Sequence, residues 1–436
     1  MNRIAILGCV VSFLFLQICC DAEVNPNINS VSEKSENNIL IASFDTIWQT
    51  VNENHYDPTF GGVDWNEIYK RYQKHVADLD DNDQFIELAN KMLKELKLSH
   101  YVVFDVKKSS DSGSPLISQG TIGLETRIID SKAIAKSVKQ GSPAFAAGLR
   151  QGYEITMIDS VPVAQMIKDA EESHISHFNN RVLVSSMNDA ILNRFFGEAD
   201  SSVVVTYIDA KGIEQESEII RQERPLKTII DENFPAIYVD FESKVIESDI
   251  GYVYFDAFSP PVDTMFAKAI DSMKNIKGLI IDIRGNPGGM HEVGEAIASK
   301  LVNEKTLFSL FRTRDGVEEV YVNPDEKIFT GPVTVLIDVM NGSASERFSA
   351  CIQSIGRAVI IGEWSPGSVG PSDIKELPNG ASFMYLIAQS LTPDGTVLEG
   401  YGVKPDIAVN LDRDELLNGI DTQVERAVQY IRDNNK

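Results

Sequence analysis

The feature that most constrains the fold is an alternation of β-prone and helix-prone segments from residue 250 onward. Short apolar runs have the composition of buried strands, and the stretches between them have helical spacing. Such alternation is typical of a sheet covered by helices. The expected strands are 251–255, 278–284, 333–336, 358–361, 382–388 and 406–409, and the expected helices are 262–275, 292–301 and 424–432. We predict an α/β core over residues 227–413 and a C-terminal helix within 414–436.

One of these strands runs into a tight turn of small residues, Asn341-Gly-Ser-Ala-Ser-Glu346, before a helix begins. Such a turn can expose a serine hydroxyl beside backbone N–H groups at a helix N-terminus, where an oxyanion would be stabilised. The simpler interpretation is a helix cap, in which Ser343 or Ser345 bonds the first helical turn. Judged on the turn alone, the cap is the commoner structure.

The N-terminal part of the chain has three predicted segments. Arg3 precedes an apolar stretch, Ile4–Ile18, that is short for a membrane span, so residues 1–20 are predicted to be an export signal. Residues 21–37 are polar and are expected to form a flexible tether. Residues 38–106 have helical spacing and are predicted to form a helical subdomain, which ends at Ser99-His100 and a β-prone run.

Cysteine usage agrees with export but leaves lipidation open. Three of the four cysteines lie in or just after the apolar stretch, and only Cys351 remains in the body of the chain, so no intrachain disulfide is expected after processing. Leu16-Gln-Ile-Cys19 loosely resembles a bacterial lipoprotein cleavage site, but Ile18 stands where a small residue is expected. A lipid anchor at Cys19 or Cys20 is therefore an open alternative to simple export into the periplasm or cell envelope.

Charge and motif content exclude several classes of function. A formal charge of −24 argues against nucleic acid and anionic membranes as partners. The sequence has no HExxH motif and no paired cysteines in its body, and His174 and His177 lack an obvious third metal ligand. Phosphate-binding glycine motifs are also missing. We expect neither a metal nor an organic cofactor, and the oligomeric state is not predictable.

Residues 116–226 resemble a PDZ domain. The resemblance rests on Gly141-Ser-Pro-Ala-Phe-Ala-Ala-Gly-Leu149 and Gly152-Tyr-Glu-Ile-Thr-Met-Ile-Asp159. Thr121-Ile-Gly-Leu-Glu125 stands where PDZ domains have their carboxylate-binding loop. The resemblance implies that backbone N–H groups of Ile122, Gly123 and Leu124 bind a peptide C-terminus, while the peptide adds as a strand to the sheet.

The order of motifs resembles that of the tail-specific, or C-terminal processing, serine peptidases. After the PDZ-like region come Asp282-Ile-Arg-Gly-Asn-Pro-Gly-Gly289, the serine turn, Gly356-Arg-Ala-Val-Ile-Ile-Gly362 and Gly402-Val-Lys-Pro-Asp406. The resemblance covers nearly all of the exported chain and implies a Clp-protease/crotonase-like core with an inserted PDZ domain. It also implies that Ser343 is the nucleophile and that the N–H groups of Ala344 and Gly288 form the oxyanion hole.

One position departs from the processing branch of this family. That branch uses a lysine 25 residues beyond the nucleophile as the base, but here the position holds Ser368. A serine hydroxyl cannot act as a base near neutral pH. The tricorn-core branch uses instead a Ser-His pair before the PDZ domain and a glutamate near Gly-Val-x-Pro-Asp. Ser99, His100 and Glu399 match those positions, which implies that His100 is the base and that Ser99 and Glu399 orient it.

The sequence thus predicts an exported serine endopeptidase that acts on polypeptides. One alternative is a catalytically inactive PDZ adaptor, since the lysine is missing, and another is an esterase with the same serine machinery. We expect structural roles for Arg284 and Asn286 in the glycine turn, for Asp406 after Pro405, and for Glu346 as a carboxylate at a helix terminus.

Overall fold

The computed structural model describes residues 32–109, 114–173, 178–229 and 234–435. The predicted export signal, Cys19 and Cys20, and the pair His174 and His177 lie outside these ranges. Within them, no helix combines the length and the apolar character needed to cross a membrane.

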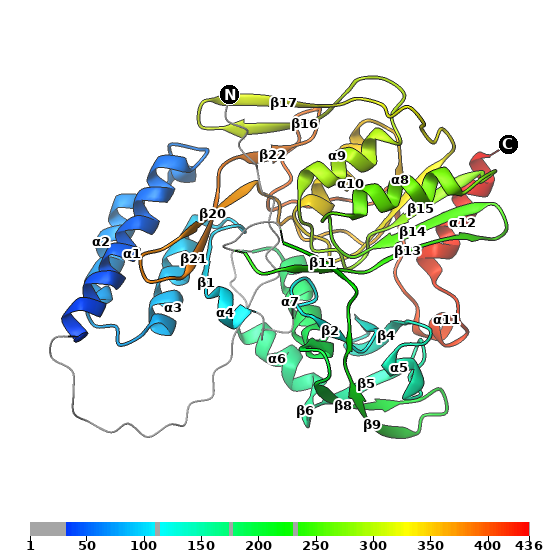
Figure 1. Ribbon diagram of the computed structural model, residues 1–436, viewed down its shortest axis with the longest axis horizontal. Helices are drawn as coiled ribbons and strands as arrows, with labels where there is room; N and C mark the ends of the chain where they lie inside the picture. Colours follow the sequence, from blue (N-terminus) through cyan, green and yellow to red (C-terminus); the bar gives the residue numbers. More distant parts are fainter. Residues whose placement is uncertain (1–31, 110–113, 174–177, 230–233, 436) are drawn as a thin grey trace.

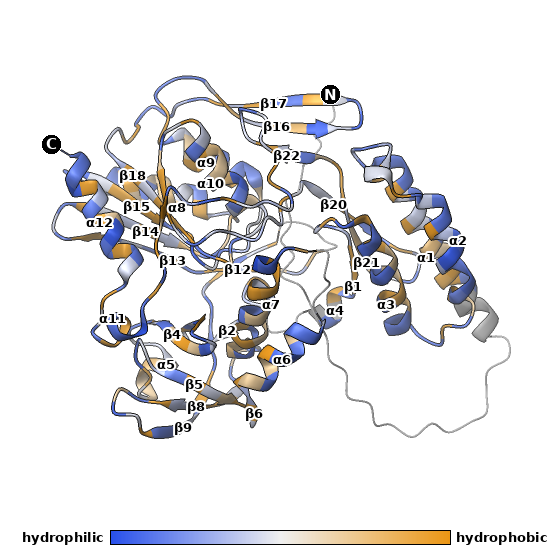
Figure 2. Cartoon of the chain, turned by 180° about the vertical axis from the view of Figure 1, so that it is seen from behind, coloured by the Kyte–Doolittle hydropathy of each residue, from blue (hydrophilic) through white to orange (hydrophobic). Residues whose placement is uncertain are grey.

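The core contains a six-stranded sheet in the order β13-β14-β15-β18-β19-β23. All neighbouring pairs are parallel except β13 with β14. Every residue of β15 and β18 is buried, as expected for parallel strands covered on both faces. The strands are β13 (Phe241–Ile246), β14 (Ile250–Phe255), β15 (Gly278–Asp282), β18 (Val333–Ile337), β19 (Val359–Gly362) and β23 (Ile407–Ala408). Figure 2 shows strongly hydrophobic colouring on β14, β15 and β18.

Helices cover both faces of this sheet. Because successive side chains of a strand point to opposite faces, Leu279 and Ile281 pack into one core and Ile280 into the other. The first core contains residues of three helices, α8 (Val262–Ser272), α9 (His291–Ser299) and α10 (Ala344–Ser354). The second contains residues of α12 (Thr422–Asn434). The predicted mixed α/β fold is confirmed, and the terminal helix forms part of the core.

The N-terminal helices pack on a second, smaller sheet of the core. Their buried residues share a cluster with Phe383 and Leu386 of β21, which pairs antiparallel with β1. This pairing joins the segment after His100 to a strand almost 300 residues further along (Figure 1). The elements are α1 (Ser32–Asn54), η1 (Phe60–Gly62), α2 (Trp65–Val76), α3 (Asn82–Leu93), η2 (Lys94–Leu96), β1 (Val102–Phe104), α4 (Val106–Ser109), β20 (Ser372–Glu376) and β21 (Ser382–Leu386).

Two predicted boundaries are corrected. Helix α1 begins at Ser32, so the last six residues of the predicted tether 21–37 are helical. Their composition is polar, but glutamate and lysine favour helices, so polarity did not exclude a helix there. Leu116 and Ile117 were predicted to begin the PDZ-like domain but belong to the main core cluster of the α/β sheet.

The middle domain, residues 118–224, contains a sheet in which the strands follow the order β3-β4-β5-β8-β9, and β3 lies at its edge. Two helices, α6 and α7, contribute to its core, and Figure 1 shows it below the α/β sheet. Its elements are β2 (Gly120–Thr121), β3 (Leu124–Ile129), β4 (Lys132–Val138), α5 (Pro143–Ala146), β5 (Glu154–Ile158), β6 (Val161–Pro162), α6 (Val163–Ser173), α7 (Asn180–Leu192), η4 (Asn193–Phe195), β7 (Phe196–Gly197), β8 (Ser202–Ile208), β9 (Glu214–Ile220) and β10 (Gln222–Glu223).

The remaining elements connect or flank these parts. Strand β16 pairs with both β17 and β22 in a three-stranded sheet, and β11 pairs with β12. Their bounds are β11 (Leu226–Thr228), β12 (Ile237–Val239), β16 (Thr306–Thr313), β17 (Gly316–Val322), β22 (Gln389–Leu391) and α11 (Arg413–Leu417).

Candidate active site

Ser343 lies at the junction between the sheet and α10 in a strained conformation. Its φ of 49° and ψ of −121° lie outside the regions that ordinary L-residues favour. Its side chain makes no capping hydrogen bond, and Ser345 is buried inside the helix, where its Oγ accepts from Asn341 at 2.6 Å. The helix-cap interpretation is therefore wrong for both serines. The strain at Ser343 points instead to a functional position.

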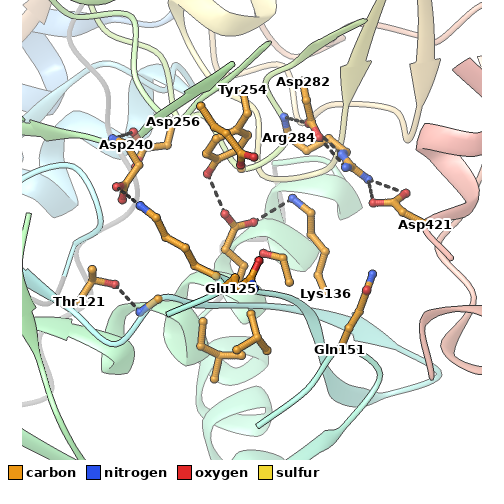
Figure 3. A pocket seen from close by; sticks show the side chains of 18 of the residues that line it. Thr121, Glu125, Lys136, Gln151, Asp240, Tyr254, Asp256, Asp282, Arg284 and Asp421 are labelled. Atoms are coloured by element: carbon orange, nitrogen blue, oxygen red, sulfur yellow. Dashed lines mark hydrogen bonds and ion pairs between the residues drawn. The ribbon is translucent and has the colours of Figure 1, made fainter. Parts of the chain in front are cut away.

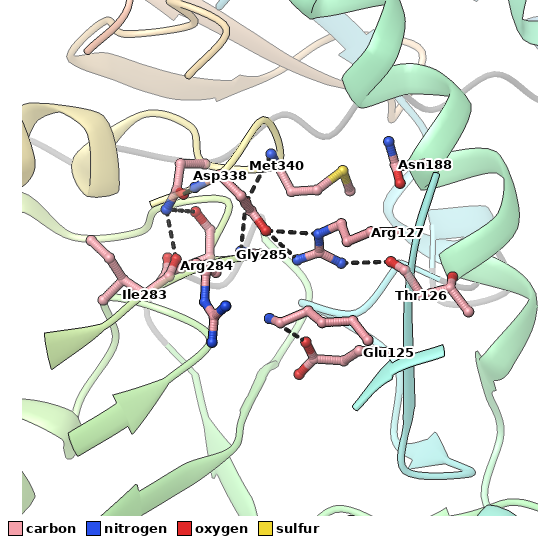
Figure 4. Close-up of polar contacts among 12 residues, drawn as sticks. Glu125, Thr126, Arg127, Asn188, Ile283, Arg284, Gly285, Asp338 and Met340 are labelled. Atoms are coloured by element: carbon pink, nitrogen blue, oxygen red, sulfur yellow. Dashed lines mark hydrogen bonds and ion pairs between the residues drawn. The ribbon is translucent and has the colours of Figure 1, made fainter. Parts of the chain in front are cut away.

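A buried polar network fixes the backbone on both sides of Ser343. Asp338 Oδ1 accepts the N–H groups of Gly285 (2.9 Å) and Met340 (3.0 Å), which joins the glycine turn to the serine turn. The other oxygen of Asp338 pairs at 2.7 Å with Arg127, which extends from β3 of the middle domain (Figure 4). Both side chains are almost fully buried. The middle domain is thus tied to the carboxylate that holds the two turns.

Gly288 lies so close to the serine turn 341–346 that no larger residue would fit at its position. A Cβ at this position would lie 2.7 Å from Ser343 Cβ and 2.9 Å from Ala344 N, and its φ is 114°. Its own N–H donates to Asn286 Oδ1 at 2.8 Å. Gly288 and Ala344 therefore meet beside Ser343, although the Gly288 N–H has an acceptor within the chain.

Ser99, His100 and Glu399 form a hydrogen-bonded chain. Ser99 Oγ lies 2.6 Å from His100 Nδ1 and donates to Glu399 Oε2 at 3.0 Å. The other oxygen of Glu399 accepts the Ser99 N–H at 2.7 Å. Because the Ser99 proton is directed to Glu399, its oxygen is left to accept a proton from His100 Nδ1. In that direction a neutral His100 imidazole carries its proton on Nδ1, and Nε2 is its basic nitrogen.

Three consecutive residues connect this chain to Ser343. The Ser343 N–H donates to the Ser368 carbonyl at 2.7 Å, and the Val369 N–H donates to Glu399 Oε2 at 2.7 Å. A Cβ on Gly370 would lie 3.7 Å from His100 Nδ1. Segment 368–370 thus contacts Ser343, Glu399 and the surroundings of His100, and Ser368 bonds Ser343 through backbone atoms.

Glu346 is a site residue that the sequence interpretation missed. It was expected to be a simple helix-terminus carboxylate, but it is fully buried and accepts hydrogen bonds from the Ser365 hydroxyl and from the N–H groups of Gly367 (2.7 Å) and Ser368 (2.8 Å). It therefore holds the loop whose Ser368 carbonyl bonds Ser343. The run of small residues 365–368 was the available signal, but it did not indicate which carboxylate they would surround.

Both buried glutamates titrate well above their usual range. Burial raises the pKa of Glu399 to about 7, although N–H donors from Val369 and Ser99 act in the opposite direction. Burial likewise raises the pKa of Glu346 to about 7, and the charge of Glu399 adds to the increase. The hydrogen-bond chain to His100 requires ionised Glu399, so this arrangement is complete only above about pH 7.

The other predicted structural residues have identifiable contacts. Asn286 shapes the glycine turn by donating to the Phe255 carbonyl at 3.1 Å and accepting from Gly288. Arg284 pairs with Asp282 and with Asp421, so it connects the turn to the start of α12. Asp406 accepts the Ile360 N–H at 2.8 Å, which joins the segment after Pro405 to β19.

The predicted peptide-binding loop lies beside a cavity of about 610 Å³ between the middle domain and the α/β sheet. Gly123 and Leu124 line this cavity together with charged side chains such as Lys136 and Lys139 (Figure 3). Two of the loop N–H groups have acceptors within the chain: Ile122 bonds the Phe195 carbonyl at 3.3 Å, and Gly123 bonds Thr121 Oγ1 at 3.1 Å.

Helix α7 of the middle domain touches both the sheet edge and the loops of the site. Asn188 accepts the Ile128 N–H of edge strand β3 at 2.9 Å. At the helix N-terminus, Asn179 donates to the Pro366 carbonyl at 2.7 Å, and Arg181 donates to the Ser365 carbonyl at 2.8 Å. This helix therefore links the edge where a peptide would add to the loop held by Glu346.

No group of three or more His, Cys, Asp or Glu residues in the described part of the chain is arranged to hold a metal ion. A strained serine beside a glycine turn, a histidine and a buried carboxylate are the kinds of group that serine-type hydrolases use.

Comparison with known proteins shows two family matches and several similar proteases. Peptidase family S41 matches residues 249–409, and the Tricorn protease C1 domain matches residues 42–94. Carboxy-terminal processing protease CtpB of Bacillus subtilis (strain 168) is 27% identical over 349 residues, which is 79% of this chain and 66% of that protein. Carboxyl-terminal-processing protease of Picosynechococcus sp. is 24% identical over 393 residues, covering 88% and 86%. The part of the chain over residues 249–409 thus matches peptidase family S41, and the chain as a whole is similar to carboxy-terminal processing proteases.

Solved structures share the fold. The photosystem II D1 C-terminal processing protease aligns with a TM-score of 0.55 at 21% identity, covering 90% of this chain and 97% of that one. Mature CPAF aligns with a TM-score of 0.58 at 13% identity, covering 92% and 97%. The chain spans just under two thirds of the length of CtpB.

Proposed function

We propose that this protein is an exported serine endopeptidase that hydrolyses polypeptides through an acyl-enzyme on Ser343, with His100 as the general base. The observation that supports it most is the chain from Glu399 through the Ser99 hydroxyl to His100 Nδ1, with both bonds at or below 3.0 Å. This chain supplies a base where the lysine of the processing branch is missing, and it favours the tricorn-core branch.

In the proposed reaction, His100 Nε2 takes the Ser343 proton as Oγ attacks the substrate carbonyl. The N–H groups of Ala344 and Gly288 receive the oxyanion, for which the Gly288 N–H must turn from Asn286 Oδ1 to the substrate. The imidazolium then donates its proton to the leaving amine. Water releases the acyl group by the reverse proton path. Ser99 and Glu399 orient the ring and stabilise its positive charge.

The middle domain is proposed to bind substrate C-termini through the N–H groups of Ile122, Gly123 and Leu124. Its support is the cavity of about 610 Å³ beside the loop. Lys136 and Lys139 also line this cavity, where they pair with Glu125 and Asp240. Since Ile122 and Gly123 already have acceptors, binding would require their hydrogen bonds to exchange. Export, with or without a lipid at Cys19 or Cys20, is proposed from the sequence alone.

Labelling with a fluorophosphonate probe tests the assignment of Ser343. The native protein should be labelled at Ser343 and should cleave an unfolded polypeptide, whereas Ser343→Ala should do neither. Binding of peptides without labelling or cleavage would favour the inactive adaptor. Turnover of small esters without any peptide cleavage would favour an esterase.

A further inference from the structure

Strand β3 has one free edge, and helix α7 lies beside it. A two-residue turn joins β3 to β4, with Ile129 opposite Lys132 at its start. Residues of such a hairpin strand bond alternately to the partner strand and to the other side, so the N–H and C=O groups of Thr126 and Ile128 face the free edge. A peptide that adds to β3 as a strand would bond these groups. Together with loop 122–124, they form the ligand edge of the middle domain.

Side chains of the protein already bond both positions on the free edge (Figure 4). The Ile128 N–H donates to Asn188 Oδ1 at 2.9 Å, and the Thr126 carbonyl accepts from Arg127 Nη1 at 2.7 Å. The carbonyl oxygen has a second lone pair, but the Ile128 N–H has only one proton. The carbonyl of an incoming peptide therefore competes directly with Asn188.

The Asn188 side chain is fixed in the orientation that this contact requires. It is 3% exposed, and its Nδ2 donates to the Val184 carbonyl of its own helix at 2.8 Å. This second hydrogen bond directs the amide oxygen toward β3. A side-chain amide has the same donor and acceptor groups as a peptide unit. Asn188 thus stands where the backbone of a bound strand would be.

The open part of the ligand edge ends before this contact. The cavity of about 610 Å³ is lined by Gly123 and Leu124 of the loop and by Leu192 of α7, whereas Ile128 and Asn188 do not line it. Ile128 lies four residues beyond Leu124, which is about 13 Å along a strand. A peptide whose C-terminus binds at the loop therefore needs about five residues to reach Asn188.

We propose that Asn188 is an internal competitor of peptide ligands, so that a peptide occupies the strand end of the ligand edge only by displacing the Asn188 amide from Ile128. The ligand is an extended polypeptide with a free carboxyl terminus. Exchange of the hydrogen bonds at Ile122 and Gly123 is required of short and long peptides alike, whereas only long ones compete with Asn188. This inference rests on the proposed peptide-binding role of the middle domain.

The test compares peptides of two lengths by equilibrium dialysis against the full chain with Ser343→Ala, which prevents cleavage. Acetylated decapeptides and acetylated tripeptides share the same randomised last three residues, and mass spectrometry measures the bound fraction. Pools with C-terminal amides give the binding to subtract. In Asn188→Ala the Ile128 N–H lacks its acceptor, and a decapeptide supplies one. We expect decapeptide affinity to rise about tenfold and tripeptide affinity to change less than about twofold.

A second variant and a matched control protect the result against misfolding. Asn188→Ser should give the same increase, because a helical serine hydroxyl bonds back to the carbonyl four residues earlier and withdraws from β3. Asn90→Ala is the control, since Asn90 of α3 also bonds a strand, accepting the Val103 N–H and donating to the Val103 carbonyl, both at 2.8 Å. It lies in the N-terminal subdomain and should leave the binding of both pools unchanged.

The outcomes separate this inference from the proposed function. Equal decapeptide binding in the parent and both Asn188 variants, including no binding to any of them, would overturn the inference. An equal increase for tripeptides would also overturn it, since they do not reach Asn188. Labelling of Ser343 and cleavage of an unfolded polypeptide do not depend on Asn188, so the peptidase assignment stands or falls separately. An increase specific to decapeptides in a protein that is never labelled would support the inference and favour the adaptor.

Discussion

The two halves of the proposed active site are built in different ways. The nucleophile turn is local: Asp338 to Glu346 form one continuous segment between β18 and α10. The base is assembled from distant segments, since Ser99 and Glu399 are 300 residues apart and are brought together by the pairing of β1 with β21. The local half has a motif that sequence alone can detect. The distant half could be predicted only by resemblance to a family pattern, and the fold shows how its parts meet.

Both halves depend on a buried carboxylate with backbone partners. Asp338 holds the serine and glycine turns, and Glu399 holds Ser99 and Val369. Glu346 links the two halves, because it binds the loop whose Ser368 carbonyl accepts the Ser343 N–H. The next residue of that loop is Val369. The comparison predicts that changes at the base should reduce catalysis with little effect on stability, whereas changes at the turn should affect both.

The largest expected effect comes from Glu399→Gln. A glutamine amide can donate to Ser99 Oγ, which reverses the hydrogen-bond direction and favours the wrong His100 tautomer. We expect kcat to fall by about 10³- to 10⁴-fold, as when a triad carboxylate becomes an amide. Steady-state kinetics on a cleavable peptide measures this loss.

The exposed Glu376→Gln is the matched control and should retain parental kcat. Glu399→Gln added to His100→Ala should cause little further loss, since the two act as a unit. Independent, multiplying losses would contradict the chain from Glu399 to His100.

Gly288→Ala should damage the nucleophile turn. The added Cβ would meet Ser343 and Ala344 within 3 Å, so the turn must shift and the oxyanion donors must move with it. A loss of about 10²- to 10³-fold in kcat is expected, similar to removal of one oxyanion donor, and Tm should also fall.

Gly395→Ala separates the clash from backbone strain. Gly395 also has a positive φ, 85°, but a Cβ there would meet nothing within 4 Å. It should lower Tm slightly and leave kcat unchanged. Equal kinetic losses in the two variants would show that close approach at Gly288 is not the cause.

Glu346→Gln should have a smaller effect that depends on pH. Burial raises the folded-state pKa of Glu346 from 4.5 to about 7, so the folded protein keeps a proton that the unfolded chain releases. Stability from this group therefore falls as pH rises from about 4.5 to about 7, by on the order of 3 kcal/mol. The Glu346→Gln variant has no titrating group at this position, so its stability does not fall in this way. The Tm of the variant minus the Tm of the parent should therefore increase as pH rises from about 4.5 to about 7.

Thermal unfolding at pH 5, 6 and 7 measures the slope, with exposed Glu326→Gln as the control. We also expect kcat to fall about tenfold, because the loop that bonds Ser343 loses its carboxylate acceptor. A Tm difference that stays constant with pH would show that Glu346 does not titrate in this range.

Much of the core was predictable because its strands are continuous apolar runs, such as Leu279–Ile281 and Val333–Ile337, which only a sheet covered on both faces can bury. The local turn alone favoured a helix cap, and Ser343, Ser99, His100 and Glu399 were all predicted from their positions within a family pattern. Glu346 was missed because its burial depends on the loop 365–368 folding back over α10.

The most direct test of the account compares His100→Ala with Ser368→Ala in kcat/KM on one peptide. Ser368 stands where the lysine base would be, but its contacts with Ser343 and Glu346 are made by backbone atoms. We predict that His100→Ala lowers kcat/KM by at least about 10³-fold, while Ser368→Ala stays within a few-fold of the parent. Comparable losses in both variants, or an active His100→Ala enzyme, would contradict the histidine base.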